Sequence, residues 1–206
     1  MTNFKTEQEQ FWAGNFGDEY TNRNIGANII ASNTALFSKI LSRTEKVNSV
    51  IEFGANIGLN LQAIRNLLPQ VQLQAIEIND TAVKLLEKID NIKIYNQSIL
   101  DFIPLEKVDF VLIKGVLIHI NPDFLVQVYD LLYNSCGRYL CLSEYYNPTP
   151  VEINYRGHSE KLFKRDFAGE ILDRFPNFRL IDYGFVYHRD PWSCQEDINW
   201  FLLEKI

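Results

Sequence analysis

The chain has 206 residues, of which 47% are hydrophobic, and this suits a single domain with a substantial core. Its formal net charge is -6, which argues against a nucleic-acid partner because phosphate binding needs clustered Lys and Arg. No apolar run approaches membrane-spanning length, and the first residues do not have the pattern of a secretory signal. The three cysteines do not have the spacing of a metal site. We therefore expect free thiols, no metal, no membrane partner and a cytoplasmic location.

Hydrophobic periodicity predicts helices that alternate with short strands, starting with a helical region that contains 25–41. Because the strands are apolar and rich in β-branched residues, we expect a mainly parallel sheet covered on both faces. The predicted strands are 49–53, 72–77, 92–95, 108–113, 138–144, 178–187 and 198–204, and the later helices are 58–68, 79–89, 122–135 and 159–175.

The first predicted strand ends in a turn of small residues that lets a ligand approach the backbone. Gly54 and Gly58 can adopt positive φ or leave room where a Cβ would clash, and the amides that start the next helix attract polar or anionic groups. Glu77 ends the second predicted strand, where nucleoside-binding α/β folds place an acid for ribose hydroxyls. The turn and the acid together predict a nucleoside-containing cofactor.

The spacing of this turn does not fit the G-x-G-x-x-G fingerprint of dinucleotide-binding proteins. Glu52-x-Gly54-x-Asn56-x-Gly58 instead resembles the E/D-x-G-x-G-x-G loop of class I S-adenosylmethionine-dependent methyltransferases, with Asn56 in place of the middle glycine. Asn tolerates left-handed backbone better than other non-glycine residues, so the turn remains possible. An ordinary strand-to-helix turn is the alternative for a two-glycine match taken alone.

Three further segments extend the resemblance in the same order. Gln97-Ser98 stands where the methyltransferase pattern commonly carries a Gly-Asp pair beside the adenine, and Ser98 keeps a hydroxyl for the adenine amine. The run 108–119 resembles the fourth-strand signature, whose end faces the sulfonium side of the cofactor. The last two strand-like runs resemble the antiparallel hairpin that distinguishes methyltransferases from dinucleotide-binding domains.

The resemblance implies a Rossmann-like class I methyltransferase fold of the α/β class, with a mostly parallel seven-stranded sheet and a C-terminal antiparallel hairpin. We expect one domain over 1–206, with an N-terminal helical lid or cap over 1–45 and the Rossmann-like core over 46–206. The implied cofactor is S-adenosyl-L-methionine, and its product is S-adenosyl-L-homocysteine. The expected cofactor-binding residues are Tyr20, Arg23, Glu52, Gly54, Ala55, Asn56, Gly58, Glu77, Ile78, Ser98, Ile99, Lys114 and Gly115.

The densest group of polar and aromatic residues follows the fifth predicted strand and predicts a site for a second substrate. Its flat aromatic faces and arginine forks suit a polar, anionic small molecule. The alternative is that the tyrosines pack on the loop while Arg165 and Asp166 form a surface ion pair. The expected substrate-binding residues are Tyr145, Tyr146, Tyr155, Arg156, Lys164 and Arg165.

Methyl transfer to a hydroxyl or a protonated amine requires a base, and the candidates are His119, Glu144 and His158. His119 comes first, and the alternative for it is a structural histidine that is hydrogen-bonded to backbone. The aromatic residues of the segment 11–24 either form a lid or cap an open edge of the domain.

Nearly the whole chain resembles the methyltransferases associated with pseudaminic acid biosynthesis. This family implies a sugar-type acceptor, a nonulosonic (pseudaminic) acid or a nucleotide-sugar-related metabolite, in flagellar or surface glycan synthesis. A non-catalytic S-adenosylmethionine-binding regulator of glycan assembly, a nicotinamide oxidoreductase and a protein or nucleic-acid methyltransferase remain alternatives. The resemblance is carried by the segments 11–24, 114–122, 144–150, 155–158, 164–167 and 190–192.

Overall fold

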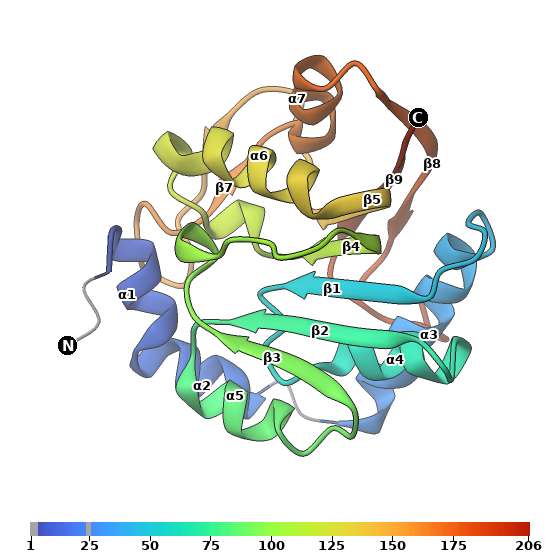
Figure 1. Ribbon diagram of the computed structural model, residues 1–206. Helices are drawn as coiled ribbons and strands as arrows, with labels where there is room; N and C mark the ends of the chain where they lie inside the picture. The colour runs from blue at the N-terminus through green and yellow to red at the C-terminus, as the bar shows by residue number, and fades with distance from the viewer. Residues whose placement is uncertain (1–3, 24–25) are drawn as a thin grey trace.

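Seven strands form one sheet in the computed structural model, which describes residues 4–23 and 26–206 (Figure 1). Their order across the sheet is β3-β2-β1-β4-β5-β9-β8, and β9 runs antiparallel to both of its neighbours while the other pairs are parallel. The strands are β1 Ser49–Phe53, β2 Gln72–Glu77, β3 Ile92–Asn96, β4 Val108–Lys114, β5 Cys136–Glu144, β8 Phe178–Val186 and β9 Ile198–Lys205.

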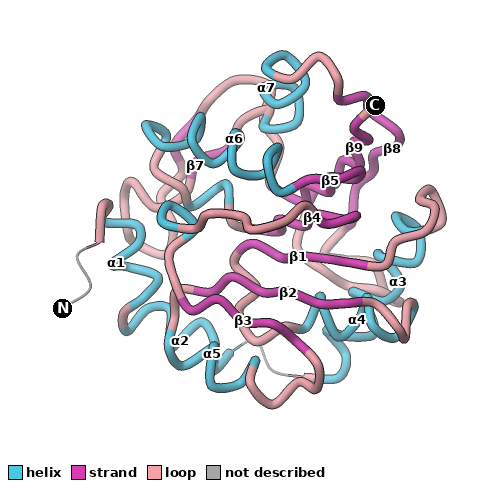
Figure 2. The backbone as a smooth tube through the Cα atoms, viewed as in Figure 1, coloured by secondary structure: helices cyan, strands magenta, loops and turns pink. Residues whose placement is uncertain are grey.

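Helices cover both faces of this sheet, as Figure 2 shows. Successive residues of a strand point to opposite faces. Val50 and Leu112 therefore pack under α3, α4 and α5, while Ile51 and Val111 pack under α6 and α7. These helices are α3 Ala27–Leu41, α4 Leu59–Leu67, α5 Asp80–Leu86, α6 Leu125–Ser135 and α7 Phe167–Arg174.

The predicted mostly parallel sheet with a C-terminal antiparallel hairpin is confirmed, and the strand ends differ from the prediction by only one or two residues. Runs of apolar residues buried on both faces produced this agreement, because such runs fit only the inside of a covered sheet. Short 3-10 turns follow two of the strands or precede a helix: η1 Ile99–Asp101, η2 Leu117–His119 and η3 Pro122–Phe124.

The helix predicted over 159–175 is wrong at its start, because α7 begins only at Phe167. Asp166 caps that helix by accepting the Gly169 amide at 2.8 Å. The preceding residues form a strand, β7 Phe163–Lys164, which pairs with β6 Val151–Glu152. A tertiary pairing therefore removes these residues from the helix that their periodicity predicted.

Two short helices, α1 Glu7–Ala13 and α2 Asn15–Arg23, precede the core. In Figure 1 the arrowheads of β1, β2 and β3 point toward them. Within the segment predicted as a cap, 1–45, α3 packs on a face of the sheet beside α4. Residues 1–3 and 24–25 of that predicted segment lie outside the described residues. Among the helices that are described, none has the length and apolar content to cross a bilayer.

Candidate active site

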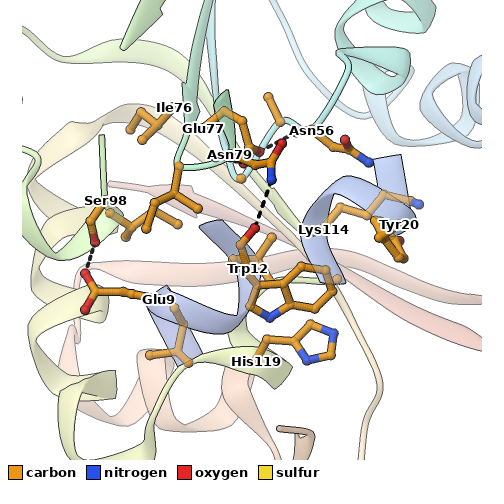
Figure 3. A pocket seen from close by; sticks show the side chains of 18 of the residues that line it. Glu9, Trp12, Tyr20, Asn56, Ile76, Glu77, Asn79, Ser98, Lys114 and His119 are labelled. Atoms are coloured by element: carbon orange, nitrogen blue, oxygen red, sulfur yellow. Dashed lines mark hydrogen bonds between the residues drawn. The ribbon is translucent and has the colours of Figure 1, made fainter. Parts of the chain in front are cut away.

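A cavity of about 230 Å³ lies at the carboxyl ends of β1 to β4, beside α1 and α2 (Figure 3). Open parallel sheets bind ligands at this edge because the loops that follow the strands meet there. Of the predicted cofactor residues, Arg23, Glu52 and Gly58 lie outside the lining. The cavity is lined by the others, which are Tyr20, Gly54, Ala55, Asn56, Glu77, Ile78, Ser98, Ile99, Lys114 and Gly115.

The loop after β1 turns through three left-handed residues, with φ of 73° at Gly54, 46° at Asn56 and 77° at Gly58. A Cβ on Gly54 would lie 2.6 Å from Cγ2 of Val116, so this position excludes other residues. Asn56 tolerates the conformation, and its Oδ1 accepts a hydrogen bond from Oγ1 of Thr21 in α2 at 3.0 Å. The departure from the glycine pattern therefore joins the loop to the N-terminal helices.

Glu77 closes the same loop from the end of β2. Its Oε2 accepts the Asn56 amide at 2.7 Å, and its Oε1 accepts the Asn79 amide at 2.8 Å. Burial raises the pKa of Glu77, and the backbone amides act in the opposite direction. A carboxylate has about four lone-pair sites, so Glu77 keeps acceptor capacity for hydroxyl groups of a ligand.

One end of the cavity offers the Asn60 side chain and the Lys114 cation, and Glu52 lies beside Asn60 outside the lining. Asn60 Nδ2 donates to Glu52 Oε1 at 2.6 Å, which leaves Glu52 Oε2 and Asn60 Oδ1 buried and without a partner among the described residues. Burial raises the pKa of Glu52 to about 8 and lowers the pKa of Lys114. Figure 3 shows Lys114 beside Tyr20, away from Ser98. This end therefore suits a ligand that carries both an ammonium and a carboxylate.

Ser98 lies buried where β3 passes into η1. Its Oγ accepts the Leu100 amide at 3.0 Å and donates to a carboxylate oxygen of Glu9 in α1. Sequence reasoning missed Glu9, whose one local signal is the capping box that it forms with Thr6. The end of β3 is thus paired with an acid from a distant helix.

Asn79 joins the loop after β2 to the same helices. Its Nδ2 donates to the Trp12 carbonyl at 3.2 Å and to Oδ1 of Asp18 at 3.0 Å, while its Oδ1 caps α5 through the Ala82 amide at 2.9 Å. Hydrogen bonds from Thr81 and Asn79 hold the pKa of Asp18 below its ordinary value. The loops after β1, β2 and β3 each contact α1 or α2, so these helices cover the cavity as a lid.

His119 lines the cavity from η2. Its Nδ1 lies 2.5 Å from the Lys161 carbonyl oxygen, which can only accept, so Nδ1 carries the proton and Nε2 keeps its lone pair. Burial lowers the pKa of His119 to about 4, so the ring is neutral near pH 7. His119 therefore forms the backbone hydrogen bond expected of a structural histidine and also keeps a nitrogen, Nε2, with a free lone pair.

Glu144, the second candidate base, holds η2 and does not line the cavity. Its Oε1 accepts the amides of Val116 and Leu117 at 3.0 Å each, and its Oε2 accepts the Ile118 amide at 3.5 Å. Burial raises the pKa of Glu144 to about 8, against the lowering effect of these amides. Glu144 therefore orients the turn that carries His119.

The third candidate, His158, is exposed and lies outside the lining of the cavity. Its ring centre is 5.0 Å from that of Phe11 and 5.8 Å from that of Phe16, so it packs on the lid. Tyr155 of the same loop reaches inward, with its ring centre 5.0 Å from that of His119 and 6.5 Å from that of Trp12.

Arg165 forms a different ion pair from the surface pair considered with Asp166. Its Nε lies 2.6 Å from Oε1 of Glu170, whereas Asp166 caps α7 through Gly169. The start of α7 explains the difference, because the Asp166 side chain is used as the N-cap of that helix. The Arg165 guanidinium is therefore already paired with a carboxylate of the same chain.

The other predicted substrate-binding residues also lie outside the lining of the cavity. The hydroxyl of Tyr145 donates to Glu196, and the Lys164 amine lies 4.9 Å from the Tyr145 ring centre. Tyr146 and Arg156 are exposed. These side chains therefore lie outside the space that a ligand within the cavity would occupy.

Sequence reasoning also missed Gln8, Asn60 and Asn79 as lining residues. Asn79 carries a usable signal, since Asn before an apolar helix is a preferred N-cap. Gln8 and Asn60 carry no local signal. Within the ranges 4–23 and 26–206, no cluster of three His, Cys, Asp or Glu side chains is placed to hold a metal ion.

Comparisons with known proteins give a match in structure only. No protein-family model matches the chain, and no curated protein matches it. Among solved structures, it is similar to the 1,6-didemethyltoxoflavin-N1-methyltransferase of Burkholderia thailandensis, with S-adenosylhomocysteine bound. The TM-score is 0.69 at 14% identity, over 96% of this chain and 86% of that one.

Two further methyltransferases have the same architecture. The magnesium protoporphyrin IX methyltransferase of Synechocystis PCC 6803, with bound SAM, gives a TM-score of 0.65 at 14% identity over 100% of both chains. The glycopeptide N-methyltransferase MtfA, complexed with S-adenosyl-L-methionine, gives 0.64 at 14% identity over 85% of this chain and 95% of that one. This protein therefore has the Rossmann-like fold of class I S-adenosylmethionine-dependent methyltransferases.

Proposed function

We propose that this protein is an S-adenosylmethionine-dependent methyltransferase that acts on a small polar acceptor. The observation that carries the proposal is the lined cavity at the carboxyl ends of β1 to β4. Its polar groups follow the order of the parts of that cofactor: Ser98 for the adenine, Glu77 for the ribose, and Lys114 for the methionine end. The three similar methyltransferases with this cofactor or its product bound support the same assignment.

The methionine end provides the sharpest test of fit. Asn60 Oδ1 is buried and has no partner among the described residues, and leaving such an atom unpaired costs about 1–3 kcal/mol. The α-ammonium of S-adenosylmethionine has a donor for Asn60 Oδ1, which belongs to a residue of the lining, and Lys114 suits its carboxylate. Glu77 would accept the ribose hydroxyls.

When bound, S-adenosylmethionine supplies an electrophilic methyl group on a sulfonium sulfur. Positioning the acceptor against that group supplies roughly 7 to 11 kcal/mol of the barrier, so the chain needs little further chemistry. For a hydroxyl acceptor, His119 Nε2 takes the proton as the carbon–oxygen bond forms and the carbon–sulfur bond breaks. Glu144 orients His119 by holding η2.

We further propose a sugar-type acid as the acceptor, a nonulosonic (pseudaminic) acid or a nucleotide-sugar-related metabolite. The sequence resemblance over 114–122, 144–150 and 155–158 supports this class. Tyr155 adds a flat face beside His119, and Arg23 and Arg156 are close enough to influence its ionisation. Aromatic faces with adjacent cations suit a sugar ring that bears a carboxylate or a phosphate.

Calorimetry with S-adenosylhomocysteine tests the cofactor assignment. The wild-type protein should bind it, and Glu77→Ala should weaken binding by about 1.5–3 kcal/mol, the range for hydrogen bonds to a charged group. Glu87→Ala is the matched control because Glu87, the residue after α5, is exposed and lies outside the cavity lining. Undiminished affinity in Glu77→Ala would remove Glu77 from the site, and binding of NAD instead would favour an oxidoreductase.

Incubation with labelled methyl donor and candidate sugar acids tests the reaction. A mass increase of one methyl group in a sugar acid supports the acceptor class. Cofactor binding without transfer to any acceptor would favour the non-catalytic regulator.

A further inference from the structure

No acidic residue stands at the end of β3, but the carboxylate of Glu9, from α1, lies beside it. Ser98 stands where the methyltransferase pattern commonly has an acid, and its hydroxyl donates to Glu9, 89 positions earlier in the chain. Both side chains are buried and both line the cavity. Figure 3 shows Glu9 rising from the lid toward Ser98.

The Glu9 carboxylate is fixed by the start of its own helix. Its Oε2 accepts the amides of Lys5 and Thr6 at 2.8 Å each, and this leaves Oε1 directed at Ser98. Oε1 still has one lone pair after accepting from Ser98. The Ser98 Oγ also has one, because its single proton goes to Glu9 and one lone pair takes the Leu100 amide.

Two acceptors therefore lie together in a cavity whose lining also includes the apolar residues Ile76, Ile99 and Leu100. Apolar side chains suit the faces of a flat heteroaromatic ring, and an exocyclic amine on that ring has the two donors that these acceptors require. A ring carbonyl at the same place would meet two acceptors and no donor.

We propose that Glu9 of the lid is the adenine-specificity residue and that it acts with Ser98 on the 6-amino group of the cofactor. This inference rests on the proposed function. It makes the lid part of the cofactor site. The carboxylate that would recognise the adenine belongs to Glu9 of α1, whereas the end of β3 supplies only the hydroxyl of Ser98.

The variant Glu9→Gln separates recognition from structure. Glutamine also serves in a capping box, so the start of α1 is retained. With its carbonyl oxygen on the Lys5 and Thr6 amides, the glutamine presents an amide N–H group to the base, which opposes an amine and favours a carbonyl.

Calorimetry on the full chain should compare S-adenosylhomocysteine with its deaminated form, S-inosylhomocysteine. We expect Glu9→Gln to bind S-adenosylhomocysteine about tenfold or more weakly than wild type and to bind S-inosylhomocysteine more tightly. The double variant Glu9→Gln/Ser98→Asp returns an acid to the end of β3 and should restore the preference for the adenosyl compound. Glu19→Gln is the control, since Glu19 is exposed on α2 and lies outside the lining.

Equal losses for both ligands in Glu9→Gln would show a merely structural role and would overturn the inference while the proposed function stands. A wild-type protein that binds neither ligand would overturn both. Unfolding of each variant in urea checks that the fold is retained.

Discussion

His119 combines burial with one fixed hydrogen bond, and this decides how its charge responds to pH. The Nδ1 contact with the Lys161 carbonyl fixes the tautomer, and burial sets the pKa at about 4 in place of 6.5. The folded protein therefore resists protonation of His119 over a pH range in which the unfolded chain accepts the proton. As the pH falls from 6.5 to 4, the contribution of His119 to the free energy of unfolding falls, and it is fully present above pH 6.5.

We expect His119→Asn to lower turnover by about a hundredfold or more, the range for removal of a general base, with little change in cofactor affinity. In the wild type, protonation of His119 itself should not lower turnover between pH 8 and 6, because the base is already neutral there. A pH–rate profile on the methylated acceptor measures both effects, with His188→Asn as the control at an exposed histidine. Full activity of His119→Asn would exclude His119 as the base.

At the scale of elements, the N-terminal helices are attached to the sheet by polar contacts with loops that the cofactor itself would touch. Thr21 bonds to Asn56 in the loop after β1, and Asn79 in the loop after β2 bonds to Trp12 and Asp18. The bonds to Asn56 and to the Trp12 carbonyl join neutral groups and contribute about 0.5–1.5 kcal/mol each, and the bond to the Asp18 carboxylate contributes about 1.5–3 kcal/mol. The lid therefore opens at a lower free energy than the core unfolds.

We expect Asn56→Gly to loosen α2 without disturbing the loop, because glycine adopts the positive φ of this position at no steric cost. Amide hydrogen exchange should become faster across 15–23 and remain unchanged in β1 and β4. Thr34→Ala is a suitable control, since the Thr34 hydroxyl bonds within α3, to the Ile30 carbonyl. Unchanged exchange in α2 would mean that this bond does not hold the lid.

For the whole molecule, a ligand in the cavity touches both the sheet edge and the lid, so its binding stabilises the assembled fold. A ligand at one hundred times its dissociation constant stabilises a protein by about 2.7 kcal/mol. In a domain of this length each kcal/mol raises Tm by about 2–4 °C. S-adenosylhomocysteine at that excess should therefore raise Tm by about 5–11 °C in a thermal melt.

NAD under the same conditions should leave Tm unchanged, which separates the methyltransferase from the oxidoreductase interpretation. A shift with NAD and none with S-adenosylhomocysteine would reverse the assignment of the cavity.

The sequence by itself determined the sheet, the turn after β1 and the acid that ends β2. Each depends on local chemistry: apolar runs that fit only a covered strand, glycine and asparagine where the backbone is left-handed, and Glu77 at a strand end. Glu77 and the loop that it closes are only 21 positions apart, joined by one helix, so their contact follows from the strand order.

Only the tertiary structure decided how the lid meets the site. The bond between Ser98 and Glu9 spans 89 positions, and that between Asn79 and Trp12 spans 67, so neither leaves a periodic signal. Tertiary packing also made Glu144, which ends β5, a support for η2, and it left His158, in a later loop, outside the cavity. Local propensity fixes elements and turns, whereas the partner of a buried polar group depends on which helix covers it.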